Sequence, residues 1–94
     1  MNWNDADMIN ALSREAGMDA AAREIRNNKD IPGRNALRSI LARKAQNCAM
    51  HADYHCDSVG EWLDYLADSM IWILRAADIT GTDLGAEIKR KLGG

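Results

Sequence analysis

Several features are missing from this sequence, and each absence excludes a class of protein. The net charge of −2 lacks the basic excess typical of dedicated nucleic-acid-binding proteins. No apolar run approaches the ~20 residues of a membrane-spanning helix. The first ten residues hold neither a basic start nor an apolar core, so we expect no signal peptide and a cytoplasmic location. Nucleic acid and membrane are therefore not expected as partners.

Phenylalanine is absent, proline occurs once and β-branched residues are scarce, whereas Ala, Leu, Arg and Met are plentiful. This composition favours helix over strand. Hydrophobic residues make up 47% of the 94 residues, which is enough for a chain of this length to collapse into one domain. We therefore predict a single all-α domain over residues 1–94.

The N-terminal part of the chain, residues 1–31, is predicted to contain two short helices. Gly17 is a typical C-terminal stop for the first helix, and Asp19 is a plausible cap for the second. Pro32 then removes a backbone donor and favours extended geometry in the residue before it. This segment is therefore expected to end before the long helices begin.

The central part, residues 34–80, is predicted to be a helical hairpin. Asn35 is a candidate cap for its first helix. Ser58 and Glu61 form an S-x-x-E capping box, the strongest local start signal in the chain, where the second helix begins. A short last helix is expected over 82–92. The predicted architecture is thus a bundle of four to five helices.

Each hairpin helix carries an apolar stripe at helical spacing. On the first helix the stripe is flanked by Ile40 and His51 and spans about 80° at 100° per residue. Its members are Leu37, Leu41, Lys44, Cys48, Ala52 and His55. On the second helix a wider face is predicted to be buried. It comprises Val59, Trp62, Leu63, Leu66, Met70, Ile73, Leu74 and Ala77.

Two further apolar residues, Ile71 and Trp72, lie well off the wide face of the second helix. A helix that is apolar on more than one side is buried on more than one side, and 94 residues provide little material to cover both. We therefore expect a homo-oligomer with Ile71 and Trp72 near its interface, and with His51 and His55 at the polar end. The alternative is a single exposed tryptophan.

The segment CAMHADYHC, residues 48–56, contains both cysteines and both histidines of the chain. Cys48, His51 and His55 follow one helical face at a spacing that suits zinc. Packing or interface contacts are the alternative, and a nucleophilic Cys–His pair is a third interpretation. Helical spacing separates Cys48 from Cys56 by about 12 Å, too far for a disulfide, so free thiols are expected.

Charged side chains suggest two more sites on the hairpin. Glu61, Asp64 and Asp68 share one stripe of the second helix, and grouped carboxylates suit Mg²⁺. A solvated surface is the alternative for this stripe. A basic set on the first helix can neutralise phosphates or pair with the acidic stripe of a neighbouring subunit. Its members are Arg34, Arg38, Arg43 and Lys44.

The segment DYLADSMIWILRAADITGTDLGAEIKRKL, residues 64–92, resembles the C-terminal half of MazG-type nucleotide pyrophosphohydrolases. The similarity lies in a Leu-Ala-Asp step, an apolar helix, a Gly-x-Asp-Leu turn and a final Lys-Leu. PGRNALRSIL, residues 32–41, is similar to the opening of the first catalytic helix of that family. The resemblance therefore spans residues 32–92 and implies a MazG-like helical hairpin.

Members of that family cleave nucleoside triphosphates between the α and β phosphates, using Mg²⁺ held by carboxylate pairs on both hairpin helices. The first pair falls on Arg43 and Gln46 here, and Tyr65 stands where a glutamate is expected, although Asp68 is kept. Lys91 matches a family lysine that meets phosphate. The resemblance thus implies a degenerate catalytic site, at which Arg43 in place of an acid can bind phosphate directly.

Three functions follow from these observations. We favour a non-catalytic oligomer that binds a nucleotide-like anion, through Arg43, Lys91 and Arg38, or a protein partner. The first alternative is a Mg²⁺-dependent nucleoside triphosphate pyrophosphohydrolase with a rearranged acidic site at Glu61, Asp64 and Asp68. The second is a mobile-element or phage-type inhibitor or sponge that sequesters a nucleotide signal or a host protein.

Overall fold

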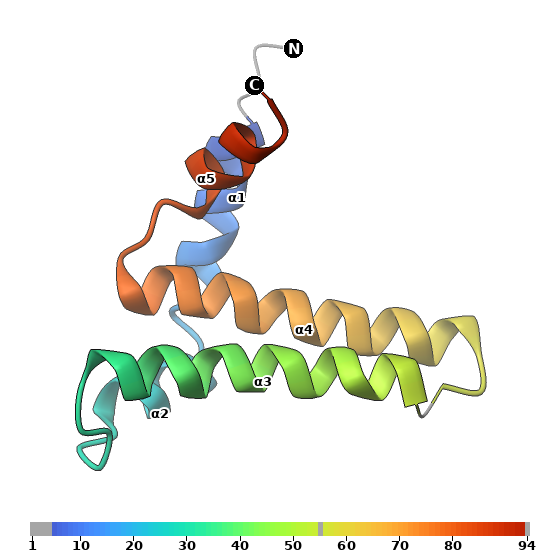
Figure 1. Ribbon diagram of the computed structural model, residues 1–94, viewed down its shortest axis with the longest axis horizontal. Coiled ribbons are helices and arrows are strands. Elements are labelled where there is room, and N and C mark those ends of the chain that lie inside the picture. The colour runs from blue at the N-terminus through green and yellow to red at the C-terminus, as the bar shows by residue number, and fades with distance from the viewer. Residues whose placement is uncertain (1–4, 55, 94) are drawn as a thin grey trace. The chain divides into compact units, whose positions relative to one another are not determined.

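The computed structural model describes residues 5–54 and 56–93 of the chain. These residues form five α-helices and no strand (Figure 1). The helices are α1 (Asp5–Ala16), α2 (Ala20–Asn27), α3 (Arg34–Tyr54), α4 (Val59–Thr80) and α5 (Leu84–Lys91). The all-α class and the hairpin of two long helices are confirmed. Within the described part of the chain, no helix is long and apolar enough to cross a membrane.

Local capping explains where α2 and α4 begin. The Asp19 carboxylate accepts a hydrogen bond from the Ala22 backbone N–H at 2.9 Å and caps α2. Ser58 Oγ accepts from the Glu61 N–H at 3.2 Å, while Glu61 Oε2 reaches back to the Asp57 N–H at 3.1 Å. The predicted capping box therefore forms, with its return bond one residue earlier than usual.

Two boundaries have other determinants. α3 begins at Arg34, with the Gly33 carbonyl accepting from the Leu37 N–H at 3.0 Å. Asn35 thus lies inside the first turn, and its prediction as the cap is wrong. After α4 the chain turns at Gly81, whose φ of 67° is the left-handed geometry that glycine tolerates best.

The contacts divide the chain into two compact units, with the boundary inside α4. The first unit contains residues up to Asn27 and from Leu74 onward, and the second contains residues 28–73. The sequence had suggested one domain with the N-terminal helices, the hairpin and the last helix as successive segments. The observed grouping instead joins both ends of the chain in the first unit.

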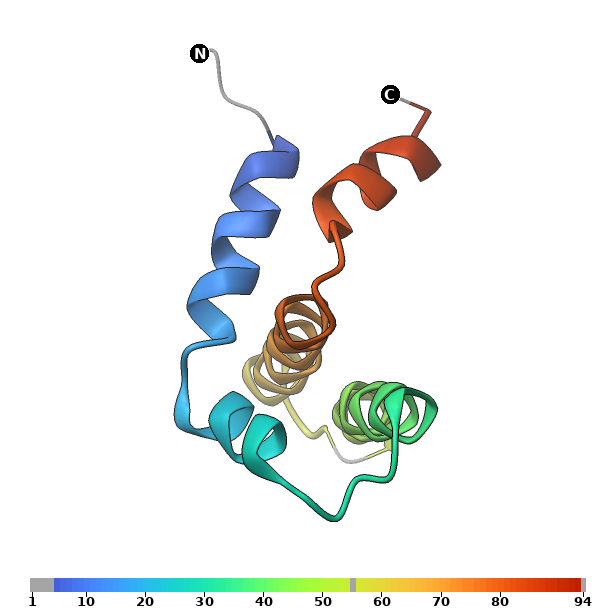
Figure 2. The ribbon, with the colours of Figure 1, turned by 90° about the vertical axis from the view of Figure 1, so that its left-hand side faces the viewer.

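In the first unit α1 packs against α5 (Figure 2). Gly85 is buried, and its N–H donates to the Asn10 Oδ1 atom at 2.9 Å. Arg26 donates to the Gly17 carbonyl and forms an ion pair with Asp78. A Cβ atom added at Gly17 would overlap Asp78, so glycine allows this close approach between the end of α1 and the end of α4.

The second unit is the hairpin, in which α3 and α4 up to Ile73 run antiparallel side by side (Figures 1 and 2). Three contacts fix its register. The Lys44 Nζ atom lies 5.0 Å from the Trp72 ring centroid, and the His51 and Tyr65 rings stack 5.3 Å apart. The third is a hydrogen bond from Ser69 Oγ to the Ala45 carbonyl at 2.8 Å.

The stripe predicted on α3 agrees with the observed burial of its described members. Leu41 is 1% exposed and Ala52 7% exposed, while Leu37 and Cys48 are half-buried. Lys44 joins the stripe through its contact with Trp72. His55 lies outside the described residues.

Candidate functional site

The wide apolar face of α4 is largely uncovered, so the prediction that the whole face is buried is wrong. Leu74 and Ala77 are buried, at 7% and 6% exposure. The other six side chains are between 36% and 72% exposed. We call these six the α4 face: Val59, Trp62, Leu63, Leu66, Met70 and Ile73. They span about 100° of the helix circumference at 100° per residue.

A different side of α4 meets α3. Tyr65, Ser69 and Trp72 make the hairpin contacts, and Ser69 is 8% exposed. Its small side chain allows the two backbones to approach, and its hydroxyl is satisfied by the Ala45 carbonyl. A pattern based on hydrophobicity alone misses this side, because it contains a serine and a tyrosine, and its tryptophan faces a lysine of α3.

The residues predicted at an oligomer interface differ in their burial and in their contacts. Trp72 is half-buried inside the hairpin, beneath Lys44, and His51 stacks on Tyr65. Ile71 is 37% exposed on another side of α4. The larger uncovered apolar surface is therefore the α4 face, and His55 lies outside the described residues.

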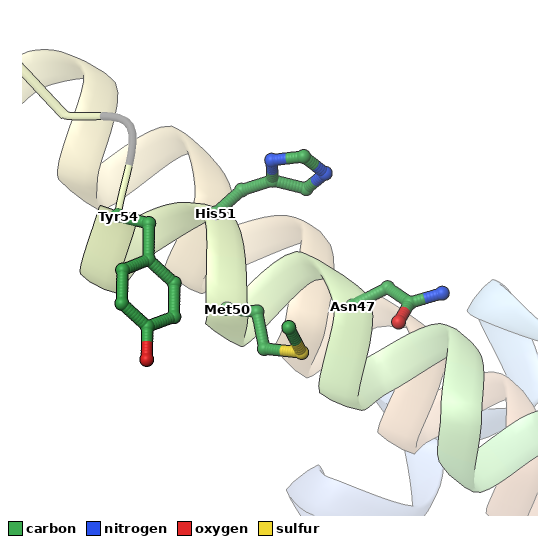
Figure 3. A pocket seen from close by; sticks show the side chains of 4 residues that line it. All are labelled: Asn47, Met50, His51 and Tyr54. Atoms are coloured by element: carbon green, nitrogen blue, oxygen red, sulfur yellow. The ribbon is translucent and has the colours of Figure 1, made fainter.

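A shallow groove of about 150 Å³ lies on α3. Asn47, Met50, His51 and Tyr54 line it, and Figure 3 shows their side chains projecting from neighbouring turns. Their spacing of i, i+3, i+4 and i+7 places them along one side of the helix. Tyr54 is 72% exposed and Met50 47% exposed, so an aromatic face and a thioether are accessible to a ligand here, whereas the His51 ring stacks on Tyr65.

The predicted phosphate ligands are exposed cations on two elements. Arg43 and Arg38 lie on α3 in the second unit, and Lys91 ends α5 in the first unit. Arg43 precedes Asn47 by one helical turn, so it lies on the same side of α3 as the groove. The three residues remain predicted anion ligands.

The acidic stripe Glu61, Asp64 and Asp68 is exposed along α4. Glu61 is engaged in capping through its bond with the Asp57 N–H. Among residues 5–54 and 56–93, no three His, Cys, Asp or Glu side chains are grouped closely enough to hold a metal ion. The described chain thus offers no preassembled magnesium site at these carboxylates.

Both cysteines are free thiols, as their spacing predicted. Partial burial raises the pKa of the Cys56 thiol, and the nearby Glu61 and Asp57 carboxylates raise it further. A raised pKa keeps the thiol protonated and less nucleophilic, which disfavours a Cys–His nucleophile at this position. The zinc prediction at Cys48, His51 and His55 includes a residue outside the described part of the chain.

A second cavity, of about 280 Å³, lies in the first unit and was missed by the sequence analysis. Asn10 and Arg14 of α1 line it together with Asp78 and Asp83. The Ala86 backbone N–H and the Asn10 amide lower the pKa of Asp83. Asn10 and Asp83 are 73 positions apart in the sequence, so no local pattern connects them.

Asp19 links α2 to the end of α4 and gives the first unit a pH-dependent contact. Its carboxylate accepts from Arg75 Nε at 2.8 Å, and this bond, aided by the Ala22 N–H, lowers the pKa of Asp19. A folded-state pKa below the unfolded value stabilises the fold above the unfolded pKa, and this contribution is lost as pH falls through the folded pKa. The contact therefore strengthens the first unit at neutral pH and is lost in acid.

Replacing Asp19 separates its charge from its capping role. Asp19→Asn keeps an oxygen for the Ala22 N–H but removes the ion pair, and should cost under about 1 kcal/mol at pH 7 because the pair is partly exposed. Asp19→Ala removes both and should cost about 1–2 kcal/mol. Urea denaturation followed by circular dichroism at pH 7 and pH 3 measures both. The Asp19→Asn deficit should be smaller at pH 3 than at pH 7, because the contribution of the ion pair is lost as pH falls toward the lowered pKa of Asp19, and an unchanged deficit contradicts the assignment.

Comparison with known proteins gives no match: no protein-family model, curated protein or solved structure matches this chain significantly. The MazG-type resemblance therefore stays a hypothesis that rests on its short motifs.

Proposed function

We propose that this chain is a non-catalytic helical binding protein that acts by association through the hairpin. The uncovered α4 face carries this proposal. Its exposed fractions correspond to roughly 600 Å² of apolar surface, which is the upper end for the largest patch on an ordinary monomer. Apolar surface of this extent on one helix is typical of an interaction site.

The environment of Tyr65 supports the non-catalytic part of the proposal. In a MazG-like hairpin this position would carry a metal-binding glutamate, whereas here the tyrosine ring stacks on His51. An aromatic pair supplies no oxygen ligand of the kind that Mg²⁺ prefers. Arg43 stands at another of the carboxylate positions that the resemblance implies, and its charge would oppose cation binding.

A nucleotide-like anion is a second candidate ligand, favoured by the groove on α3. An exposed tyrosine ring offers a surface on which a base can stack, and Arg43 one turn from Asn47 offers a charge for phosphate. Such binding needs no metal. It would make the hairpin a carrier or sponge for a small anion.

Native mass spectrometry together with a pyrophosphate-release assay tests the proposed function. The protein, purified without chelator, should be found in assemblies heavier than one chain, because the α4 face is covered by association. A panel of nucleoside triphosphates with Mg²⁺ should give no pyrophosphate above background. Turnover that chelator abolishes would establish the pyrophosphohydrolase alternative, and a strictly monomeric protein would contradict association.

A further inference from the structure

We propose that a second copy of this chain covers the α4 face, with the two α4 helices antiparallel and a two-fold axis beside Leu66. This proposal rests on the proposed function and specifies the partner. Its motivation is the arrangement of the six exposed apolar residues along the helix. A two-fold contact uses the same patch on both subunits, so that patch must be complementary to itself.

The α4 face is nearly symmetric about Leu66 along the sequence. An antiparallel pairing centred there places Trp62 opposite Met70 of the second copy, and Val59 opposite Ile73. Leu63 falls opposite Ser69, which is occupied in the hairpin. Five of the six positions thus meet an apolar position of the same face, a match that a contact with an unrelated protein does not require. The pairing of a rigid indole with a flexible thioether also suits close packing.

The charges of α4 are compatible with this self-contact. Glu61, Asp64 and Asp68 lie about 150° or more from the centre of the α4 face at 100° per residue. The carboxylates of the two copies therefore point away from the shared seam, and no like charges meet there. Antiparallel pairing also sets the two helix dipoles in opposite directions, which is the more favourable arrangement.

The available area is consistent with a specific dimer. Complete burial of both α4 faces would remove about 1,200 Å² in total from water, which is the lower limit for stable protein–protein interfaces. The six residues extend about 21 Å along the helix at 1.5 Å per residue. A single neighbouring helix is long enough to cover this length, and α4 itself supplies one.

Disulfide cross-linking in a cysteine-free background, Cys48→Ala with Cys56→Ala, tests the pairing. Leu66→Cys lies beside the two-fold axis, so mild oxidation should link most chains as covalent dimers. Val59→Cys should not link to itself, because the two copies of that position would be about 21 Å apart. Val59→Cys mixed with Ile73→Cys should give cross-linked heterodimers of the two variants. Circular dichroism of each variant verifies that the helices are retained.

Sedimentation of the same proteins distinguishes the possible failures. Efficient cross-linking of Val59→Cys to itself would show a parallel pair and overturn the inference. Self-association without cross-linking of Leu66→Cys would show another surface or register, again overturning the inference while the proposed function stands. If the protein stays monomeric at every concentration, both the inference and the associative function fail.

Discussion

Replacing Leu66 with glutamate is expected to weaken self-association by at least about 100-fold while the hairpin remains folded. Leu66 is 36% exposed and takes part in none of the three contacts that fix the register of the hairpin, so the substitution leaves those contacts in place. Circular dichroism of Leu66→Glu verifies that the helices are retained. In the two-fold pairing, Leu66→Glu brings two carboxylates together beside the axis. Their repulsion and the desolvation of each together cost several kcal/mol.

Sedimentation equilibrium of wild type and Leu66→Glu measures this loss. Asp64→Asn, on the opposite side of the same helix, is the control: it makes the net charge −1, whereas Leu66→Glu makes it −3. It should associate as wild type does. A general charge effect would strengthen the association of Asp64→Asn while Leu66→Glu weakens it, and unchanged association of Leu66→Glu would place the interface elsewhere.

The helices of this chain could be predicted because their signals are local. The Ser58–Glu61 capping box and the turn at Gly81 are each encoded within a few residues, and the structure contains both. The α3 stripe around Leu41 could likewise be predicted, since its apolar residues recur at helical spacing and its described members are buried or half-buried, apart from Lys44, which contacts Trp72.

The covered side of α4 could not be predicted in the same way. Its sequence offers a strongly apolar side and a mixed side, and hydrophobicity selects the first. The hairpin uses the mixed side, where Ser69 permits close approach and Tyr65 finds a ring partner. Which side of a helix is buried depends on the helix that packs against it. The hydrophobic pattern of α4 alone contains no information about the side chains that α3 contributes.

The cavity and ion pairs of the first unit were unpredictable for a related reason. Asp19 pairs with Arg75 across 56 positions, and Asn10 bonds to Asp83 across 73. Each of these residues has an ordinary local explanation as a cap or a surface residue. Their pairing follows from the return of the chain's two ends to one unit.

Gly85→Ala is expected to have the second large effect. Helix propensity alone predicts that it stabilises the protein, whereas the packing of α5 against α1 predicts that it destabilises it. Gly85 lies in the first turn of α5, where alanine is the better helix former by about 1 kcal/mol. A Cβ atom at this position would, however, come within 2.2 Å of the Ala6 carbonyl oxygen and 2.8 Å of its carbon. Because these are backbone atoms of α1, the two helices must separate to admit the methyl group.

We therefore expect Gly85→Ala to destabilise the first unit by about 3 kcal/mol, despite its better helix propensity. The hydrogen bond from the Gly85 N–H to Asn10 should be lost as α5 moves away from α1. Thermal denaturation followed by circular dichroism should show a fall in Tm on the order of 15 °C. Gly60→Ala is the matched control, because Gly60 is the second residue of α4 as Gly85 is of α5, and its added Cβ meets nothing nearer than the Ser58 Oγ atom at 3.8 Å. Its Tm should not fall below that of wild type. A Gly85→Ala protein as stable as the Gly60→Ala control would show that α1 and α5 do not pack as closely as the structure places them.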